Sequence, residues 1–523
     1  MKNNQIKTVM KGALILSVAS LIAKILSAFY RIPLENLVGN TGFYVYQQIY
    51  PIYGIAMTFS LSGFPVYISK VIAQQEDLVQ KQLVAKRMFK ILVAFSLGSF
   101  LVLNLGAGQL ALWMGDQHLA SLINSVSFSF LLIPFLAVAR GYYQGTFEML
   151  PTAISQVSEQ LVRVFVIILV AYLAVKQDWS YYQMGTWAMF GSTLGGLVAC
   201  VSLRKFYRNI LPLKKAIPCQ LSYWDLAKNL FSEGLIICLF ASMMVLLQLV
   251  DSFTIKNGLQ ANGVAASVAK ELKGTYDRAQ PLVQLGLVVA ASFSATLLPA
   301  LTKAIQNKNA LEFKRTATLI VKLSLTLAFS ACAGLIVLMP QVNTLLFGDA
   351  SLNLTISVYV LSILIVGLIS TYTSILQSVG QFKSTLLGLI VAILIKAGLN
   401  TWLIEIFGIL GASLATVLGL VVALIIVLCS LPEGLRNLVS LVFIRKIISC
   451  TALMVLGVAI LMQGCQHFWR LTRVSALLEC SLGIVTGCII FLLTVVLFKV
   501  FTLKEWVAIP GAKKILRFCN KTR

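Results

Sequence analysis

Six basic side chains lie inside the apolar stretches of this sequence, where a charge is costly. They are Lys24, Lys70, Arg140, Arg163, Lys322 and Lys396. A Lys or Arg at the centre of a membrane helix costs about 2.5 to 3.5 kcal/mol to insert, so it usually faces a watery cavity, a partner charge or the interface. Lys70 and Lys322 lie near the ends of their stretches, and we expect them to extend to the membrane surface. Lys24, Arg163 and Lys396 lie deeper and are expected to line a cavity, with a buried ion pair as the alternative.

Acidic residues in or beside these stretches are fewer. Glu159 precedes Arg163 by four residues, so the two share one helix face and are expected to pair. Asp251 lies near the end of one stretch and Asp277 at the start of the next. A carboxylate in such a place could pair with a cation or bind Na⁺ or H⁺. Glu159, Asp251 and Asp277 are therefore candidates for ion coupling.

A short polar segment, residues 270–278, precedes one of the apolar stretches. It combines Lys270, Lys273 and Arg278 with one tyrosine and two acids. Lys and Arg side chains in such a cluster can bind phosphate, so this segment could form a cationic mouth. A solvated charged loop is the alternative.

The composition excludes a soluble globular protein. Of 523 residues, 59% are hydrophobic and 11% are charged, whereas soluble domains have about 25% charged residues. The formal net charge is +24, and in so apolar a chain we expect the anionic partner to be lipid rather than nucleic acid. With two histidines and ten cysteines scattered singly, we predict no metal site, no disulfide framework and no cofactor.

The apolar stretches are long enough to cross a membrane, which takes about 20 mostly apolar residues. We predict fourteen spanning helices and hence an all-α, polytopic membrane fold. Their limits are 12–31, 43–72, 88–114, 121–145, 152–175, 182–203, 229–255, 277–302, 317–341, 352–379, 384–405, 409–431, 440–463 and 474–501.

The basic residues between these stretches predict the orientation. Cytoplasmic loops retain Lys and Arg during insertion. With the N-terminus inside, the inner segments hold 28 of the 42 basic residues and the outer segments hold 8. We therefore expect both termini to lie in the cytoplasm.

The chain also resembles itself at a spacing of about 230 residues. Tyr44 and Lys70, near the two ends of one stretch, are 26 residues apart, and Tyr276 and Lys303 are 27 apart. Because six helices return the chain to the same side, the repeat predicts two parallel six-helix bundles with a cationic cleft between them. The expected division is an N-terminal bundle at 1–226, a second bundle at 227–437, and two further helices with a basic tail at 438–523.

Three segments carry a family resemblance: residues 23–34, residues 140–163 and residues 276–303. The first reads AKILSAFYRIPL, the second begins RGYYQGTFEMLP, and the third begins YDR and ends LLPALTK. They resemble the polysaccharide biosynthesis branch of the MOP superfamily, the SpoVB/YtgP/MurJ-like proteins, and the similarity covers essentially the whole chain.

The resemblance implies a MOP/MATE-like fold and a flippase of the bacterial cell membrane. The implied cargo is an undecaprenyl-diphosphate-linked sugar, with lipid II first. Arg278 matches a functional arginine at the start of the eighth helix, and Arg31 matches one late in the first. Gly54 stands where the family carries an arginine after a proline. We therefore take the following residues as candidates for substrate binding: Lys24, Arg31, Arg140, Arg163, Arg278 and Lys396.

The implied mechanism is alternating access, in which the two bundles rock around a cationic cavity. The expected partners are the lipid-linked oligosaccharide diphosphate, membrane lipid, a coupling ion (Na⁺ or H⁺) and other cell-wall synthesis proteins.

Three alternatives stay open. The cargo could be another lipid-linked polysaccharide unit of the capsule, teichoic acid or O-antigen type. A MATE-type drug exporter would prefer an acidic cleft, which the excess of intramembrane cations argues against. A membrane glycosyltransferase would need carboxylates on a sizeable outer loop, and the longest expected outer connection, residues 256–276, has one acid, Glu271. We therefore expect no enzyme.

Overall fold

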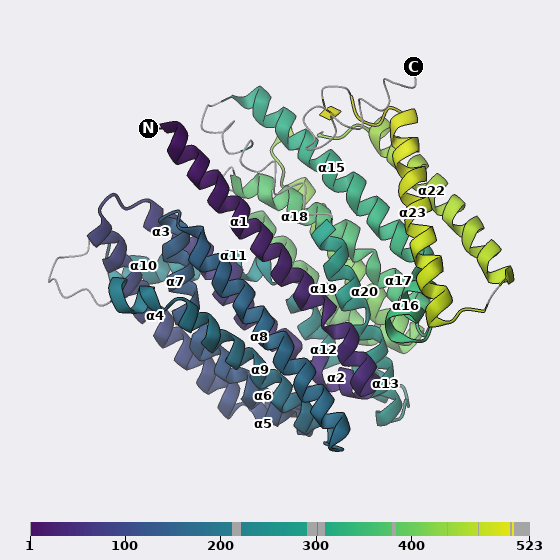
Figure 1. Cartoon of the computed structure of the whole chain (residues 1–523), viewed down its shortest axis with the longest axis horizontal. Coiled ribbons are helices and arrows are strands. Elements are labelled where there is room, and N and C mark those ends of the chain that lie inside the picture. The colour runs from purple at the N-terminus through teal and green to yellow at the C-terminus, as the bar shows by residue number, and fades with distance from the viewer. Residues whose placement is uncertain are drawn as a thin grey trace. The chain divides into compact units, whose positions relative to one another are not determined.

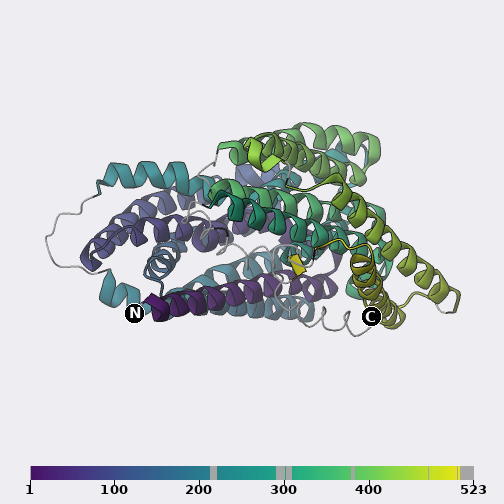
Figure 2. The ribbon, with the colours of Figure 1, turned by 90° about the horizontal axis from the view of Figure 1, so that it is seen from above.

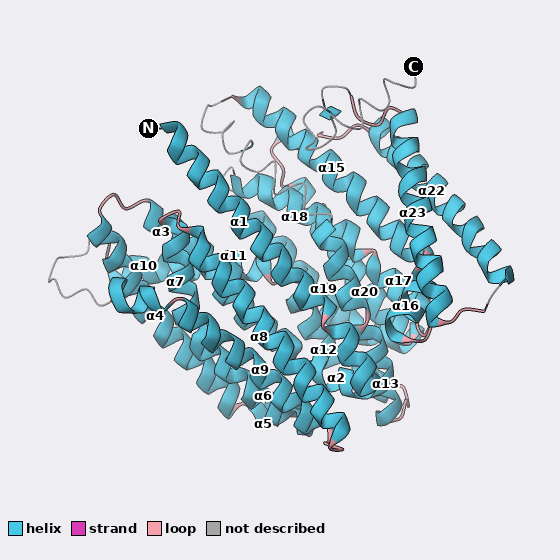
Figure 3. Ribbon diagram, in the orientation of Figure 1, coloured by secondary structure: helices cyan, strands magenta, loops and turns pink. Residues whose placement is uncertain are grey.

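The computed structural model describes residues 2–211, 221–289, 301, 309–378, 383–436, 438–468, 470–502 and 505–506. Helices make up nearly all of these ranges, and no strand occurs in them (Figure 3). The all-α class predicted from the sequence is confirmed.

The chain packs into two compact units. The first comprises Met1–Pro281 and Leu389–Gly419, and the second comprises Leu282–Gly388 and Leu420–Arg523. Every residue proposed above for substrate binding or ion coupling belongs to the first unit. The division at 226 and 437 that the internal repeat suggests stays a prediction.

The first unit is built mainly from the N-terminal helices, and α1 runs beside α8 within it (Figure 1). Figure 2 shows α1 as one long rod. The helices are α1 (Lys2–Phe29), α2 (Arg31–Thr58), α3 (Phe64–Ala73), α4 (Leu78–Leu105), α5 (Ala107–Trp113), α6 (Ala120–Ser127), α7 (Ile133–Gly145), α8 (Met149–Lys176), α9 (Tyr181–Ser202), α10 (Tyr223–Asn229), α11 (Leu235–Ala241), α12 (Met243–Ala261) and α13 (Ala266–Asp277).

Two helices, α19 (Lys383–Phe407) and α20 (Ile409–Cys429), contribute residues to both units. The remaining helices belong to the second unit. They are α15 (Ala310–Val337), α16 (Met339–Phe347), α17 (Asn353–Val360), α18 (Ser362–Ser378), α21 (Glu433–Arg436), α22 (Leu441–Phe468) and α23 (Arg473–Leu497).

Among the described residues, eleven helices are long and apolar enough to span a membrane, or twelve if one bent pair counts as a span. Three features account for the difference from the fourteen predicted. The helical segment Leu14–Ala73 contains two predicted spans. The bent pair, Tyr223–Ala241 and Met243–Ala261, meets at 70° and corresponds to the predicted span 229–255. The predicted span 277–302 lies partly outside the described residues.

Helix α2 is interrupted near its start. Gly39 has φ 68° and ψ 179°, a conformation that is essentially restricted to glycine. The break separates Arg31 and Glu35 from the part of α2 that carries Tyr46, Tyr50 and Tyr53. It lies in the gap between the first two predicted spans.

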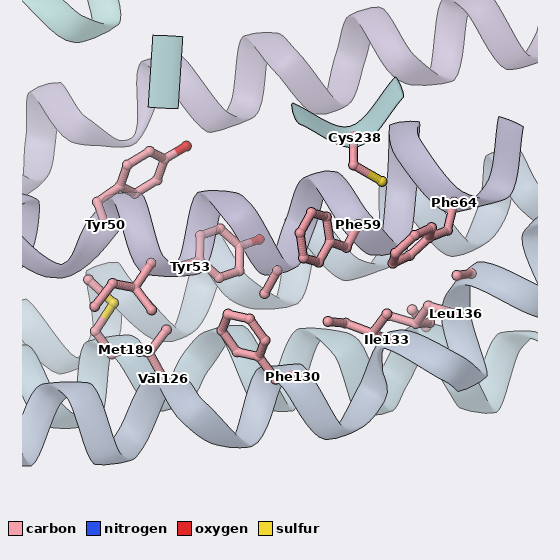
Figure 4. Close-up of a cluster of buried hydrophobic side chains, with 14 of the residues drawn as sticks. Tyr50, Tyr53, Phe59, Phe64, Val126, Phe130, Ile133, Leu136, Met189 and Cys238 are labelled. Atoms are coloured by element: carbon pink, nitrogen blue, oxygen red, sulfur yellow. The ribbon is translucent and has the colours of Figure 1, made fainter. Parts of the chain in front are cut away.

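A large apolar core holds the first unit together. Tyr50 and Tyr53 near the end of α2, and Phe59 directly after it, lie near Val126 and Phe130 of the segment that packs against α2 (Figure 4). Side chains in protein cores are as closely packed as molecules in organic crystals. The core therefore holds the helices that carry the polar site at fixed separations.

Close packing of α8 on α9 depends on glycine. A Cβ added at Gly195 of α9 would lie 2.6 Å from the backbone oxygen of Glu159 and 3.3 Å from Cβ of Arg163. A larger residue would push these two helices apart. The glycine thus fixes the face of α8 that carries the buried charges described next.

Candidate substrate-binding site

Arg163 is fully buried on α8 and is surrounded by tyrosines. Its guanidinium donates hydrogen bonds to the hydroxyls of Tyr30 (2.8 Å) and Tyr46 (3.1 Å) and to Oε1 of Gln160 (3.1 Å). Its central carbon lies 4.0 Å from the ring centre of Tyr53. Among the described residues, no carboxylate lies within ion-pair distance of Arg163.

Arg31, at the start of α2, has the same kind of surroundings. Its guanidinium lies 4.1 Å from the ring centre of Tyr50, and that of Arg163 lies 5.7 Å from the same ring. The Nε atoms of both arginines are buried and have no hydrogen-bond partner. In the part of the chain that the structure describes, Arg31 also makes no ion pair with a carboxylate.

We name this group of six residues the Arg–Tyr cluster: Tyr30, Arg31, Tyr46, Tyr50, Tyr53 and Arg163. Ring faces and phenol oxygens stabilise a guanidinium, but they carry no formal negative charge to pair with it. The positively charged side chains of Arg31 and Arg163 are therefore buried beside the same Tyr50 ring, and the Nε–H group of each has no hydrogen-bond acceptor. The group that would complete it is an anion with several oxygen acceptors, for which the planar fork of arginine is suited.

Arg140 has a different environment. Its NH2 donates to Oε2 of Glu159 at 2.6 Å, its Nε to Ser155 Oγ at 3.0 Å, and its NH1 to the backbone oxygen of Ser60 at 3.0 Å. The expected pair of Glu159 with Arg163 is therefore wrong. Glu159 turns to Arg140 because α7 packs against α8 and brings a second guanidinium to the same carboxylate.

Lys396 on α19 forms a buried ion pair with Asp251 on α12. Its Nζ lies 2.7 Å from Asp251 Oδ2 and donates a second bond of 2.7 Å to Thr416 Oγ1. Asn400 donates to the other carboxylate oxygen of Asp251 at 3.2 Å. For Lys396 the structure matches the alternative reading, a buried ion pair.

Lys273 and Asp277 of α13 and Arg278, which follows them, are also paired. Lys273 lies 2.6 Å from Asp277 Oδ1, one helical turn away. Arg278 lies 2.6 Å from Oε1 of Glu35, and the same NH2 donates to Asn40 Oδ1 at 2.8 Å. Both pairs are buried, so this segment is not a freely solvated loop. The three acids proposed for ion coupling, Glu159, Asp251 and Asp277, each have a basic partner.

Of the remaining predicted cations, Lys24 and Lys70 are exposed and Lys322 is largely buried. Lys24 has an exposed side chain on α1. Lys70 pairs with Glu233 at 2.8 Å, with about half of each side chain exposed, as expected for a residue near a helix end. Lys322 pairs with Glu505 at 2.6 Å in the second unit.

Lys270 and Asp116 form a pair outside the spanning segments. Lys270 Nζ lies 2.8 Å from Asp116 Oδ2, and Tyr182 donates to the same oxygen at 2.7 Å. Burial alone would raise the pKa of Asp116, but the hydrogen bonds from Lys270 and Tyr182 outweigh it and lower that pKa. Burial would lower the pKa of Lys270, and the bonds to Asp116 and Tyr182 raise it instead.

Sequence reasoning missed the tyrosines of the Arg–Tyr cluster. Tyr46, Tyr50 and Tyr53 are spaced i, i+4, i+7, so they share one helix face. That pattern was the available signal. Glu35 was also not among the acidic residues singled out from the sequence, although it is the ion-pair partner of Arg278.

Apolar spanning helices around buried ionic groups define a multi-pass membrane protein. Residues 9–305 match the family described as "Polysaccharide biosynthesis protein". The chain belongs to this family, as its sequence motifs predicted.

The chain is also similar to individual proteins of known sequence or structure. The chain is 38% identical over 413 residues to an uncharacterized membrane protein, YabM, of Bacillus subtilis (strain 168), covering 76% of this chain and 75% of that protein. It is 25% identical over 421 residues to the lipid II flippase MurJ of the same organism, covering 76% and 77%. Among solved structures, a lipid II flippase MurJ in an inward closed conformation has a similar fold, with a TM-score of 0.67 and 15% identity over 93% of this chain and 98% of that one.

Proposed function

We propose that this protein is a flippase for a polyprenyl-diphosphate-linked saccharide in the bacterial cell membrane, and that its cargo is the peptidoglycan precursor lipid II. The observation that carries the proposal is the Arg–Tyr cluster: two buried guanidinium groups, Arg31 and Arg163, with no described carboxylate within ion-pair distance of either. A drug exporter for cationic cargo would need the opposite charge at such a place.

The cluster suits a diphosphate. Guanidinium groups replace the water around phosphate oxygens with charge-assisted hydrogen bonds, which are about twice as strong as neutral ones. The free Nε–H groups of Arg31 and Arg163 would satisfy an incoming oxyanion without first breaking an ion pair. Arg140, Arg278 and Lys396 already hold carboxylates, so in our proposal they position helices, and the two cluster arginines contact substrate.

The direction of transport follows from the proposed orientation, with both termini in the cytoplasm. An anion moving outward gains about 2.3 kcal/mol per charge for each 100 mV of an inside-negative potential. A coupling cation bound at Glu159, Asp251 or Asp277 would have to displace a basic side chain from each. We therefore propose the membrane potential as the main driving force.

The relatives support the class of cargo. The MurJ protein of Bacillus subtilis is named a lipid II flippase, and the family is described by polysaccharide biosynthesis. The more similar relative YabM is uncharacterized. Another lipid-linked polysaccharide unit is therefore the second candidate.

The test is depletion of the protein in its host, followed by measurement of the sidedness of lipid II. We expect lipid II to accumulate in the inner leaflet, and wild-type protein to restore its outward movement. Arg31→Gln should not restore it, whereas Lys70→Gln should, because Lys70 pairs with Glu233 at the surface. Normal lipid II with loss of capsule or teichoic acid would replace lipid II by the second candidate, and no change in any lipid-linked saccharide would refute the proposal.

A further inference from the structure

An apolar groove lies on the outside of the first unit, behind the Arg–Tyr cluster. Its volume is about 590 Å³, within the range of about 300 to 1,000 Å³ that is typical of ligand sites. Ile52 and Phe130 form its buried floor, and Ala94, Gly98 and Val102 of α4 form an exposed rim. Ser99 is the one polar side chain among its lining residues.

The surface around the groove is the kind that faces hydrocarbon. Helix α4 is a candidate membrane span, and only 17% of its apolar window is buried within the protein. Val102 is 72% exposed and Leu105 is 81% exposed. An apolar hollow in such a surface takes a lipid chain, because water or a polar ligand would find no hydrogen-bond partner there.

The groove and the Arg–Tyr cluster share one stretch of α2. Tyr50 and Tyr53 contact the two arginines on one face, and Ile52 and Ile55 line the groove on the opposite face. Helix α12 has the same division. Leu249 and Phe253 line the groove, while Asp251 faces Lys396.

The contact between α2 and α12, which we call the α2–α12 seam, separates the apolar groove from the Arg–Tyr cluster. Gln48 donates to the backbone oxygen of Ser252 at 2.5 Å, and Ser252 Oγ donates to the backbone oxygen of Gln48 at 2.9 Å. Further along, a Cβ at Gly54 would lie 2.7 Å from Val245 Cγ1, so the helices nearly touch. Both bonds join neutral groups, and among the described residues no ion pair links α2 to α12, so the two helices can part without separating opposite charges.

We propose that this groove binds the polyprenyl chain of the lipid-linked substrate, and that the α2–α12 seam is a lateral opening through which the chain joins a diphosphate held at the Arg–Tyr cluster. This rests on the proposed function. It adds a second binding site, for an isoprenoid chain. In the proposed orientation, the groove lies toward the outer leaflet, so it serves release of the product.

The first experiment maps the chain directly. A polyprenyl diphosphate with a photoreactive group on its terminal isoprene is added to the full-length protein in lipid nanodiscs, and labelled peptides are identified by mass spectrometry. We expect labelling on residues 94–103 of α4 and on Leu249 or Phe253 of α12. Unlabelled polyprenyl diphosphate should compete, and phospholipid should not.

Gly98 provides a matched variant. Gly98 lines the groove, and a Cβ there meets no atom within 4 Å, so Gly98→Leu places an isobutyl group at the groove rim with no clash at its Cβ. Gly108 of α5 is equally open but does not line the groove, which makes Gly108→Leu the control. We expect Gly98→Leu to lower labelling at least tenfold and Gly108→Leu to leave it unchanged.

The outcomes separate the two proposals. If a photoreactive phospholipid labelled α4 to the same extent, the groove would be an ordinary lipid site, and the proposal that it binds the polyprenyl chain would be overturned. Retention of polyprenyl diphosphate with labels elsewhere, such as the apolar pocket of the second unit beside Leu338 and Phe491, would also overturn it and leave the flippase proposal standing. No retention of polyprenyl diphosphate at all would refute both.

A second experiment tests the seam. The Cβ position at Gly54 lies 3.6 Å from Cβ of Val245, within the range for a disulfide. We expect the Gly54→Cys, Val245→Cys double variant to lose flipping when oxidised and to regain it on reduction, while each single variant is insensitive to oxidant. Full flipping by the oxidised double variant would rule out the seam as the opening.

Discussion

Replacing Arg163 by glutamine should separate function from stability. The side chain is fully buried, and its partners are phenols, an amide and aromatic rings rather than a carboxylate. Glutamine keeps an amide donor and removes a charge that burial disfavours. We therefore expect Arg163→Gln to lower the free energy of unfolding by less than about 3 to 5 kcal/mol, the cost of a buried charge left without its partner.

Transport should respond differently. A hydrogen bond to a charged group contributes about 1.5 to 3 kcal/mol, and each 1.4 kcal/mol is a factor of ten. Arg163→Gln should therefore lower the flipping rate by about 10- to 100-fold. The assays are thermal unfolding in detergent and lipid flipping in reconstituted vesicles.

Arg140→Gln is the matched comparison on the neighbouring helix α7. It would leave Glu159 buried without its cation, which costs about 3 to 5 kcal/mol. We expect loss of folded protein, and recovery when Glu159 is also replaced, as in an Arg140→Leu, Glu159→Leu double variant. The reasoning is refuted if Arg163→Gln is destabilised as strongly as Arg140→Gln, or if it transports at the wild-type rate.

Three further predictions concern other parts of the first unit. Lys396→Met should destabilise the protein by about 3 to 5 kcal/mol, and adding Asp251→Leu should recover most of that loss. The Asp116–Lys270 pair should stabilise the fold fully between about pH 4 and 10 and lose its effect outside that window, because the pKa of the acid is lowered and that of the base is raised. Gly39→Ala should cost about 1 to 3 kcal/mol, because its backbone conformation is strained for other residues. Each is measured as a change in unfolding temperature.

The corresponding contradictions are equally direct. A Lys396→Met protein as stable as wild type would mean that Asp251 is neutral or solvated. If the difference in unfolding temperature between wild type and Asp116→Asn stayed constant from pH 3 to 8, the Asp116–Lys270 ion pair would not contribute to the stability of the fold. Gly98→Ala, at an open helical position, is the control for Gly39→Ala and should be neutral or stabilising.

The sequence was sufficient for the membrane fold because apolar length is a local property. It was also sufficient to single out Arg163 and Lys396, since a charge in an apolar run is visible without a structure. It could not predict the partners. The i, i+4 spacing on α8 predicted an ion pair between Glu159 and Arg163. In the structure, α7 packs on α8 and Glu159 pairs with Arg140 instead. Such a choice depends on tertiary contacts.

The tyrosines show the same limit. Their spacing on α2 marks a shared face, but an aromatic face is ordinarily part of an apolar core. Only the structure brings Tyr30 from before the helix and Arg163 from α8 to that face. The break at Gly39 falls in the gap between the first two predicted spans, but the sequence does not show which glycine of that gap, Gly39 or Gly42, takes the positive φ.

The most direct measurement of the central claim uses purified protein in vesicles with fluorescent lipid II in both leaflets and a membrane-impermeant quencher outside. Without protein, only the outer-leaflet fraction is quenched. The account predicts that wild-type protein exposes the inner-leaflet fraction, and that Arg31→Gln and Arg163→Gln proteins do so at least tenfold more slowly while a labelled phospholipid stays in place. Quenching no greater than in empty vesicles, or equal rates for the wild type and both variants, would contradict it.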